Sequence, residues 1–378
     1  MKVLVVSGMW PPDVGGPASH APEVCEFLRS RGHTVEAATM ASRAPAAEAY
    51  PVHWASRRLP LVVRHAAAVR MLRRAARRAD VVYTTGIIGR TSLAAALAGT
   101  PTVVKLTSDP VFERSLRWGL FRADLGAFQD AKGLRIGLLR KARDAALARA
   151  ERIVVPSEAL RELALAWGLP EGKVTVIRNP IATPRDLAGR EELRRRHGFD
   201  GPTLVFAGRL VPQKSIDVSL EAVRRNPDVK LLLAGEGPYR ERLERRAREL
   251  GLESRAPFLG PLPRQTVFEL LRAADAALLS SSWENFPHMA VEALAVGTPV
   301  LATDAGGVTE ILQDGRNGLL VPVGDAGALA GVIRRYLDDP ALQERLRAET
   351  TGSVEQFDPD VIYPQLEQVL LDVAGQRP

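Results

Sequence analysis

The chain has 378 residues, more than one hydrophobic core normally organises, so we expect two domains. Hydrophobic residues at 46% and charged residues at 25% are typical of a globular protein, and the single cysteine, Cys25, excludes an internal disulfide. The net charge of +7 would attract nucleic acid, but no helix-turn-helix, zinc finger or aromatic-rich strand pair accompanies it, so we expect no nucleic-acid partner.

The first half of the chain alternates strands with helices, which predicts a doubly wound parallel sheet. We expect strands near residues 2–7, 34–39, 81–84, 102–106, 153–155 and 174–177. The apolar run at the amino terminus is too short for a signal peptide, and no stretch approaches the roughly 20 apolar residues of a membrane span. A lone cysteine also fits a reducing compartment, so we expect a cytoplasmic protein.

The loop after the first strand contains Gly15 and Gly16, which permit close approach to the backbone. The alternative is an ordinary tight turn. His20 follows near the start of the next expected helix, where its side chain could reach a cleft beside the loop.

The positive charge is concentrated in the first half. Residues 1–187 carry 28 Lys and Arg against 16 Asp and Glu, or +12, whereas residues 188–378 carry 23 against 28, or −5. Near an anionic bilayer each basic residue contributes about 1 kcal/mol, which predicts peripheral attachment, while a solvated arginine-rich helix is the alternative. The basic residues surround an expected amphipathic helix and are Arg57, Arg58, Arg64, Arg70, Arg73, Arg74, Arg77 and Arg78.

Polar residues end the expected strand at 102–106. Asp109 is the only carboxylate in that motif, so it is our candidate for orienting a hydroxyl group or accepting its proton. The alternative is an Asx turn before Pro110. Residues 111–128 then mix aromatic side chains and leucines with arginines, which is typical of a mobile flap or of buried helix faces.

Residues 176–184 look like a linker, because an expected strand leaves through Pro180 and Pro184. We therefore place an amino-terminal domain at residues 1–180 and a second domain at residues 188–356. The last segment, about 357–378, has apolar residues at helical spacing.

In the second domain, several expected strands end in residues suited to a ligand. The strand at 204–207 runs into Gly208 and delivers Arg209 and Lys214, a guanidinium fork and a compact ammonium that both suit phosphate oxygens. The strand at 229–234 ends in Gly235, Glu236 and Gly237. Strands at 258–262 and 299–303 end similarly in glycine-containing loops. Two solvated loop cations are the alternative for the first of these turns.

Two carboxylates, Glu284 and Glu292, lie eight residues apart around the start of an expected helix. Because a buried strand at 274–280 precedes them, they should lie at the edge of the sheet where ligands bind in open parallel sheets. This arrangement suits a ligand rich in hydroxyl groups. A capping role for Glu284 and a solvated Glu292 form the alternative.

Together these motifs resemble glycosyltransferase family 4, whose members are retaining enzymes of the GT-B fold. The resemblance covers residues 208–324 and includes the arginine and lysine turn, the Gly-Glu-Gly loop, the glutamate pair, Gly297-Thr298-Pro299-Val300, Gly306-Gly307 and Asn317-Gly318-Leu319-Leu320. It implies two Rossmann-like doubly wound domains facing a cleft, with a carboxyl-terminal helix that crosses back to the first domain. It also implies transfer of a hexosyl group from a nucleoside-diphosphate sugar to a hydroxyl acceptor, with a lipid-linked or anionic glycan as one candidate.

The resemblance also implies roles for individual residues. Arg209 and Lys214 would hold the donor diphosphate, Glu292 the ribose hydroxyls, and Glu284 the donor sugar. Backbone groups of Asn285 and Phe286 would also touch the sugar, and the main chain at residues 235–238 and at Leu262 would contact the base. Gly15, Gly16, His20 and Pro287 would face the cleft. Ser215 and Asn285 stand where glycine is commoner in the family, a difference that concerns the sugar and not the reaction class.

Alternatives to this activity share part of the pattern. A sugar-nucleotide epimerase or phosphorylase of the same fold, or a non-catalytic protein that binds a nucleotide sugar, would use the same phosphate cations. A nicotinamide oxidoreductase fits less well, because neither half has Gly-x-Gly-x-x-Gly after its first strand. No Asp-x-Asp motif follows a predicted active-site strand, so we expect neither a required metal ion nor another cofactor.

Overall fold

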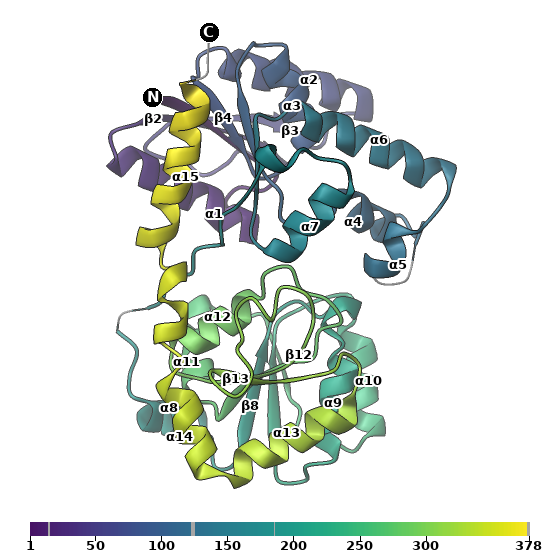
Figure 1. Ribbon diagram of the computed structural model, residues 1–378, viewed down its shortest axis with the longest axis vertical. Helices are drawn as coiled ribbons and strands as arrows, with labels where there is room; N and C mark the ends of the chain where they lie inside the picture. The colour runs from purple at the N-terminus through teal and green to yellow at the C-terminus, as the bar shows by residue number, and fades with distance from the viewer. Residues whose placement is uncertain (14–15, 122–124, 185, 376–378) are drawn as a thin grey trace. The chain divides into compact units, whose positions relative to one another are not determined.

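The structure is a computed structural model that describes residues 1–13, 16–121, 125–184 and 186–375. The chain divides into two compact units, one formed by Met1–Arg178 with Asp360–Pro378 and the other by Asn179–Pro359 (Figure 1). Each unit is a parallel sheet covered by helices on both faces, which confirms the predicted fold class of two doubly wound α/β domains.

The first unit contains a seven-stranded sheet in the order β3-β2-β1-β4-β5-β6-β7. All neighbouring strands pair in parallel, and their apolar residues are buried on both faces, as the continuous hydrophobic runs in the sequence require. The strands are β1 (Lys2–Ser7), β2 (Thr34–Ala41), β3 (Val52–Ser56), β4 (Val81–Thr84), β5 (Thr102–Lys105), β6 (Arg152–Val155) and β7 (Val174–Val176).

The helices of this unit connect successive strands, except for the last one. They are α1 (Gly16–Ser30), α2 (Leu61–Ala76), α3 (Ile88–Ala96), α4 (Pro110–Arg117), α5 (Leu125–Gln129), α6 (Leu134–Ala148), α7 (Glu158–Ala166) and α15 (Pro359–Ala374). Helix α15 runs beside α1 (Figure 1), where Phe27 and Tyr363 stack and the Tyr363 hydroxyl donates to Glu23 at 2.9 Å. Glu367 is almost fully buried and lies 2.7 Å from His33 and 3.2 Å from Arg31, so polar contacts also fix α15 to this unit.

The second unit contains a six-stranded parallel sheet in the order β10-β9-β8-β11-β12-β13. Its strands are β8 (Thr203–Ala207), β9 (Lys230–Ala234), β10 (Phe258–Gly260), β11 (Ala276–Leu279), β12 (Val300–Thr303) and β13 (Gly318–Val321). Its helices are α8 (Arg190–His197), α9 (Ile216–Arg224), α10 (Arg240–Glu249), α11 (Arg264–Ala273), α12 (His288–Ala295), α13 (Ala326–Asp338) and α14 (Pro340–Ala348). A single large core of strand and helix residues fills the unit.

Several helices begin at side-chain caps that the sequence supplies. Ser157, Asp325 and Asp339 each accept a hydrogen bond from the backbone N–H three residues later, at 2.8 to 3.1 Å. Helix α8 ends at Gly198, whose φ of +67° is the left-handed conformation that glycine adopts without strain. These local signals determine where the helices begin and end, and therefore where the chain can enter the next strand of the sheet.

Two strands were not predicted, for different reasons. Strand β3 lies at the edge of its sheet and is only partly buried, so its sequence, Val-His-Trp-Ala-Ser, lacks the apolar run of a central strand. Strand β13 begins with Gly318, where a Cβ would lie 2.3 Å from the Val300 carbonyl oxygen. Close packing of the two strands therefore demands a residue that weakens the strand signal.

The stretch at residues 111–128 contains helix faces that pack together. Phe112, Phe121 and Phe128 form a cluster with ring centroids 5.1 to 6.5 Å apart. Leu116 and Trp118 remain exposed on the same stretch. In the part of the chain that the structure describes, no helix is both long and apolar enough to cross a membrane.

Candidate active site

The order of strands reverses between β8 and β11 in the second unit, and the loops that follow these two strands form the candidate site. Ligands of open α/β sheets bind at such a reversal, outside the carboxyl ends of the strands. The loop after β8 contains Arg209 and the short 3₁₀ helix Pro212–Lys214, and the loop after β11 contains Glu284.

Lys214 and Glu284 meet across the two loops. The Lys214 ammonium donates to Oε1 of Glu284, and the Ser281 hydroxyl donates to the same oxygen at 2.6 Å. The Glu284 side chain is only 5% exposed, and that of Lys214 19%. Glu284 is thus a carboxylate held in place at the reversal of the sheet, and its charge is matched by the lysine.

Serine hydroxyls fix the loop that carries Lys214. The Ser280 hydroxyl lies 3.0 and 2.9 Å from the carbonyl oxygens of Lys214 and Ser215, and it accepts from the Ser219 hydroxyl at 2.8 Å. Ser215 itself has a φ of +44°, an uncommon conformation for a residue with a side chain. Glycine is common at this position in the family that the sequence resembles. Here a serine occupies it and adopts the left-handed backbone conformation that favours glycine.

Arg209 differs from Lys214 in its surroundings. It is exposed and makes no ion pair with any residue that the structure describes. The site thus offers one cation already paired and one available to a ligand. Helix α12, which begins after Glu284, adds backbone N–H groups, because its first turn has no side-chain cap.

The glycines at the strand ends have a different role from the one expected. A Cβ on Gly235 would lie 1.8 Å from the Gly208 carbonyl oxygen, and one on Gly237 would lie 2.2 Å from that of Leu210. The missing side chains therefore let the ends of β8 and β9 contact each other, with the Leu210 N–H donating to the Glu236 carbonyl at 2.9 Å. Approach of a ligand is not needed to explain these glycines.

The Glu236 side chain is exposed and forms an ion pair with Arg240. Glu236 lies in the turn before α10, and Arg240 is the first residue of that helix and also contacts Glu244 at 2.8 Å. An exposed pair of this kind contributes little to stability. It leaves the Glu236 backbone as the part that faces the strand ends.

Glu292 lies on α12, within the helix as expected from the sequence. Its side chain is 18% exposed, and Arg264 is 3.6 Å away at the start of α11. Burial raises the pKa of Glu292 from 4.5 to about 7, and the Arg264 charge opposes part of that rise. The carboxyl group is thus poised between its charged and neutral forms near neutral pH.

The residues around the glutamate pair are mostly buried. The Phe286 ring packs against Phe357 with centroids 5.5 Å apart and belongs to the core, which leaves its backbone as the part able to touch a ligand. Asn285 and Pro287 are also buried, and Leu262 is half-buried against the same core. Pro287 therefore does not present the open surface expected of a residue lining a cleft.

In the first unit, Asp109 is placed differently from the expectation. Its carboxylate is buried, accepts from the Val111 N–H at 2.8 Å and pairs with Arg143 at 3.3 Å. Arg143 also stacks on the Trp167 ring at 3.7 Å. Asp109 thus caps α4, the Asx-turn alternative, and an accessible base is not what this geometry provides.

Two other expected site residues, Gly16 and His20, lie in the first turns of α1. His20 is partly buried, with its Nε2 atom 3.0 Å from the hydroxyl of the buried Tyr83. Gly16 begins α1, whereas Gly15 lies outside the described residues.

Sequence reasoning missed some partners of the site. Ser281, which holds Glu284, lies in a run of three serines after β11, a signal that such a loop is hydrogen-bonded. Arg264, which faces Glu292, and Lys105, buried at the end of β5, had no motif that would mark them.

The chain matches two families of known proteins. The family described as Glycosyl transferase 4-like domain matches residues 15–180, and the one described as Glycosyl transferases group 1 matches residues 189–352. The matched region spans between 20% and 62% of the length of the curated relatives.

Individual relatives agree with these matches. The chain is 34% identical to the D-inositol 3-phosphate glycosyltransferase of Streptomyces avermitilis over 229 residues, 56% of this chain and 49% of that protein. It is 34% identical to the lipopolysaccharide core biosynthesis glycosyltransferase LpsE of Rhizobium meliloti over 216 residues, 57% of this chain and 62% of that one.

Among solved structures, the Anabaena protein HepE in complex with UDP and glucose superimposes with a TM-score of 0.78 at 22% identity, covering 98% of this chain and 100% of that one. This similarity shows a shared GT-B fold. The two family matches together cover most of the sequence: its amino-terminal part matches the Glycosyl transferase 4-like domain, and its carboxyl-terminal part matches the Glycosyl transferases group 1.

Proposed function

We propose that this protein transfers a hexosyl group from a nucleoside-diphosphate sugar to a hydroxyl acceptor, with retention of configuration at the anomeric carbon. The observation that carries the proposal is the contact between Lys214 and Glu284 at the reversal of the second sheet, with Arg209 on the same loop. A nucleotide-sugar donor is also supported by HepE, which was solved with UDP and glucose.

In this proposal, Arg209 and Lys214 hold the diphosphate. Breaking the bond between the anomeric carbon and the diphosphate leaves negative charge on phosphate oxygens, so cations fixed beforehand stabilise the transition state more than the ground state. Arg209 is available to the ligand at once, whereas Lys214 has to share its charge between Glu284 and the phosphate. The uncapped start of α12 supplies further N–H donors to the same anion.

The two glutamates then contact different parts of the donor. Glu292 accepts hydrogen bonds from the ribose hydroxyls, and Glu284, with the backbone at Asn285 and Phe286, contacts the hexose. The main chain at residues 235–238 and at Leu262 contacts the base. Because Asp109 is buried, we assign it a positioning role in the loop after β5 and not proton transfer from the acceptor.

The donor assignment is tested by thermal shift with a panel of nucleotide sugars. A donor at 100 times its dissociation constant adds about 2.7 kcal/mol of stability, which the shift in melting temperature reports. Lys214→Ala and Glu292→Gln should each abolish or greatly reduce the shift, whereas Arg248→Gln, which removes an exposed charge on α10, should leave it unchanged. Undiminished shifts in both site variants would refute the assignment.

The reaction class is tested by the products. A retaining transferase gives a glycoside with the anomeric configuration of the donor, which NMR coupling constants report. An epimerase would instead release nucleotide without an acceptor, and a non-catalytic binding protein would show the thermal shift but no product.

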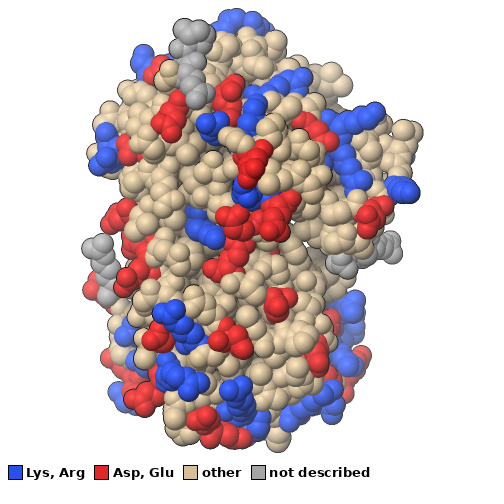
Figure 2. Space-filling view, in the orientation of Figure 1, with Lys and Arg blue, Asp and Glu red and all other residues tan. Residues whose placement is uncertain are grey.

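We also propose peripheral contact of the first unit with anionic membranes, on the inner face of the cytoplasmic membrane. At the start of α2, Leu61, Val62 and Val63 are 61%, 80% and 52% exposed, and the rest of the helix carries arginines. Lys and Arg side chains also gather over the α2 and α6 side of the unit (Figure 2). Sedimentation with anionic vesicles should show a bound fraction that falls with salt, and absence from the pellet at low salt would refute the proposal.

A further inference from the structure

A cavity of about 790 Å³ opens in the first unit, outside every candidate donor residue. It lies at the carboxyl ends of β4 and β5 and is bounded by α2, α3, α4 and α6, which pack against one another in pairs. This volume falls within the range of pockets that enclose small-molecule ligands. The carboxyl ends of parallel strands are also the expected place for a ligand.

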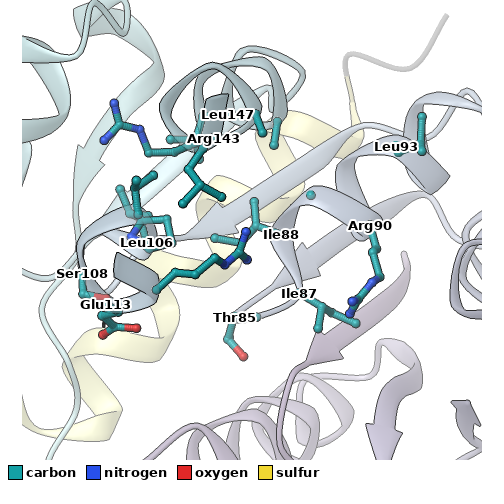
Figure 3. Close-up of a pocket in the computed structure, with 18 of the residues that line it drawn as sticks. Thr85, Ile87, Ile88, Arg90, Leu93, Leu106, Ser108, Glu113, Arg143 and Leu147 are labelled. Carbon is teal, nitrogen blue, oxygen red and sulfur yellow. Dashed lines mark hydrogen bonds between the residues drawn. The ribbon is translucent and has the colours of Figure 1, made fainter. Parts of the chain in front are cut away.

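One part of the cavity wall is apolar. Ile87, Ile88, Leu106, Leu139 and Leu147 contribute to it. Figure 3 shows Ile88, Leu106 and Leu147 lying between the side with Ser108 and Glu113 and the side with Arg90. A hydrocarbon chain would gain free energy by leaving water for this wall, whereas sugar hydroxyls would find few partners there.

Arginines at the mouth of the cavity lack acidic partners. Arg90 donates to His65 at 2.9 Å, and Arg114 stacks on the Trp118 ring at 5.6 Å. Arg64, beside them, donates to a backbone carbonyl, and its Nε atom is buried without a hydrogen-bond partner. Among the described residues no carboxylate forms an ion pair with these three arginines.

The positive charges of this cluster act on one another and on His65. Burial and then the neighbouring arginines lower the pKa of His65 and of Arg90. Glu113, the acidic side chain among the described residues of the wall, accepts instead from the Ser108 hydroxyl at 2.7 Å. An anion bound among the arginines would therefore remove a mutual repulsion that the protein itself leaves uncompensated.

The inner end of the cavity also has unused polar groups. Lys105 is buried, and its ammonium donates to the Ile177 carbonyl at 2.8 Å, which uses one of its three donors. Burial lowers the pKa of Lys105 to about 7. The Thr85 hydroxyl is buried without a hydrogen-bond partner and lies on the same wall. Arg143, in contrast, is already matched by Asp109.

We propose that this cavity binds an amphiphile whose phosphate-class anionic group contacts Arg90 and Arg114 and whose hydrocarbon chain lies along the apolar wall. We further propose that this amphiphile is the sugar acceptor, a role that rests on the proposed function. Leu93 on α3 lines the cavity and has an exposed aliphatic side chain, so it extends the apolar surface toward solvent. An amphiphile held in a bilayer could therefore enter without crossing a polar rim.

The binding claim is tested with dodecyl phosphate below its critical micelle concentration, measured by isothermal titration calorimetry. We expect binding to the wild-type protein and a loss of about 10- to 100-fold in affinity when Arg90→Gln and Arg114→Gln are combined. Leu139→Gln, on the half-buried apolar wall, should weaken dodecyl phosphate but not butyl phosphate. Arg245→Gln combined with Arg248→Gln, which removes two exposed charges of the second unit, is the control of equal charge change.

Several outcomes would overturn the inference. Equal affinity of the wild type and the double arginine variant would remove the anion site, and equal affinity of dodecyl phosphate and inorganic phosphate would remove the role of the apolar wall. Melting temperatures near that of the wild type would confirm that each variant is folded. Dodecyl phosphate supplied in neutral vesicles, compared with the free compound, distinguishes a ligand taken from a membrane from one taken from water.

The acceptor claim needs a separate readout. Hexosyl transfer to a phosphate-bearing amphiphile with a free hydroxyl, such as an alkyl glycosyl phosphate, should fall in the double arginine variant, while the thermal shift by the nucleotide sugar stays unchanged. Dodecyl phosphate binding without any transfer would refute the acceptor role but not the site. Transfer to a different acceptor, with no binding of dodecyl phosphate, would refute the site while the proposed function stood.

Discussion

Binding of the donor should depend on pH through Glu292. Ribose hydroxyls donate hydrogen bonds, so a carboxylate accepts them better than a neutral carboxyl group does. With a pKa of about 7, Glu292 is largely neutral at slightly acidic pH and largely charged at slightly basic pH. The fraction ionised rises about tenfold between roughly pH 6 and pH 8, and we expect donor affinity to rise by a similar factor.

The assay is isothermal titration calorimetry with a nucleoside-diphosphate sugar, because its diphosphate diester has no group that titrates in this range. Glu292→Gln keeps the size and should bind with a nearly constant, lower affinity across the range. Arg264→Gln removes the charge that opposes the rise in pKa, so the midpoint of the affinity curve should move to higher pH. A wild-type affinity independent of pH, or an equal slope in Glu292→Gln, would refute the reasoning.

The same group links pH to stability. The pKa of Glu292 in the folded protein, about 7, lies above its ordinary value of 4.5, so folding favours the protonated form. Its contribution is fully present below about pH 4.5 and is lost as the pH rises through about 7. The difference in melting temperature between the wild type and Glu292→Gln should therefore be constant below about pH 4.5, and the wild type should lose stability relative to the variant as the pH rises through about 7. If the donor prefers the charged carboxylate, saturating donor should reduce this loss in the wild type. A difference in melting temperature that does not change with pH would contradict the linkage.

Three further perturbations test other parts of the structure. Lys214→Ala leaves the nearly buried Glu284 carboxylate without its cation, so the free energy of unfolding should fall by about 1–3 kcal/mol and turnover by about 100- to 1,000-fold. Adding Glu284→Gln should restore the melting temperature but not turnover. A Lys214→Ala variant that is both stable and active would contradict both roles. Gly235→Ala would place a Cβ 1.8 Å from a carbonyl oxygen and should lower the free energy of unfolding, measured in urea, by more than about 3 kcal/mol. The control is Gly251→Ala, which has a positive φ but open surroundings and should lower it by about 1 kcal/mol. Lys105→Met should raise the melting temperature below about pH 7 and lose that advantage toward about pH 10.5. The reason is that the pKa of Lys105 is lowered from 10.5 in the unfolded chain to about 7, so the protonated form opposes folding fully below about pH 7 and progressively less up to about pH 10.5. An equal gain at all pH values would place the effect in packing instead.

The fold could be predicted where burial determined the sequence. Central strands such as Val81–Thr84 and Ala276–Leu279 are buried along their whole length, so their apolar runs identify them. The edge strand β3 is partly exposed and carries histidine and tryptophan among its residues, so burial leaves no run to detect. The prediction therefore failed at the edge of a sheet and at a strand that begins with glycine, where packing demands differ from strand propensity.

The site could be predicted only in part, because residue type and strand-end position are visible in a sequence but side-chain partners are not. The position of Glu284 after a buried strand predicted its place at the sheet edge, yet the ion pair that neutralises it joins residues 70 positions apart. Asp109 shows the opposite failure. A carboxylate at a strand end suggested chemistry, whereas the buried Arg143, far along the chain on α6, makes it a structural partner. Distant pairing thus decides whether a polar residue at a strand end faces a ligand or the protein.

Charge compensation separates the two candidate sites. At the proposed donor site, Lys214 already has a carboxylate partner, so a diphosphate would compete with Glu284, and part of its binding free energy would be spent on that exchange. In the same proposal, Arg209 on this loop meets no such competition and would be the first contact of the phosphate. At the cavity of the first unit, Arg90 and Arg114 have no acidic partner among the described residues, so an anion there gains attraction without displacing one. A simple anion should therefore bind more tightly to the arginines of the cavity than to Lys214. The proposed donor site should instead prefer a ligand whose hydroxyl groups can donate to Glu284 once Lys214 contacts the phosphate. Measuring inorganic pyrophosphate and a nucleotide sugar against Lys214→Ala would separate these effects, because only the nucleotide sugar can satisfy both members of the pair.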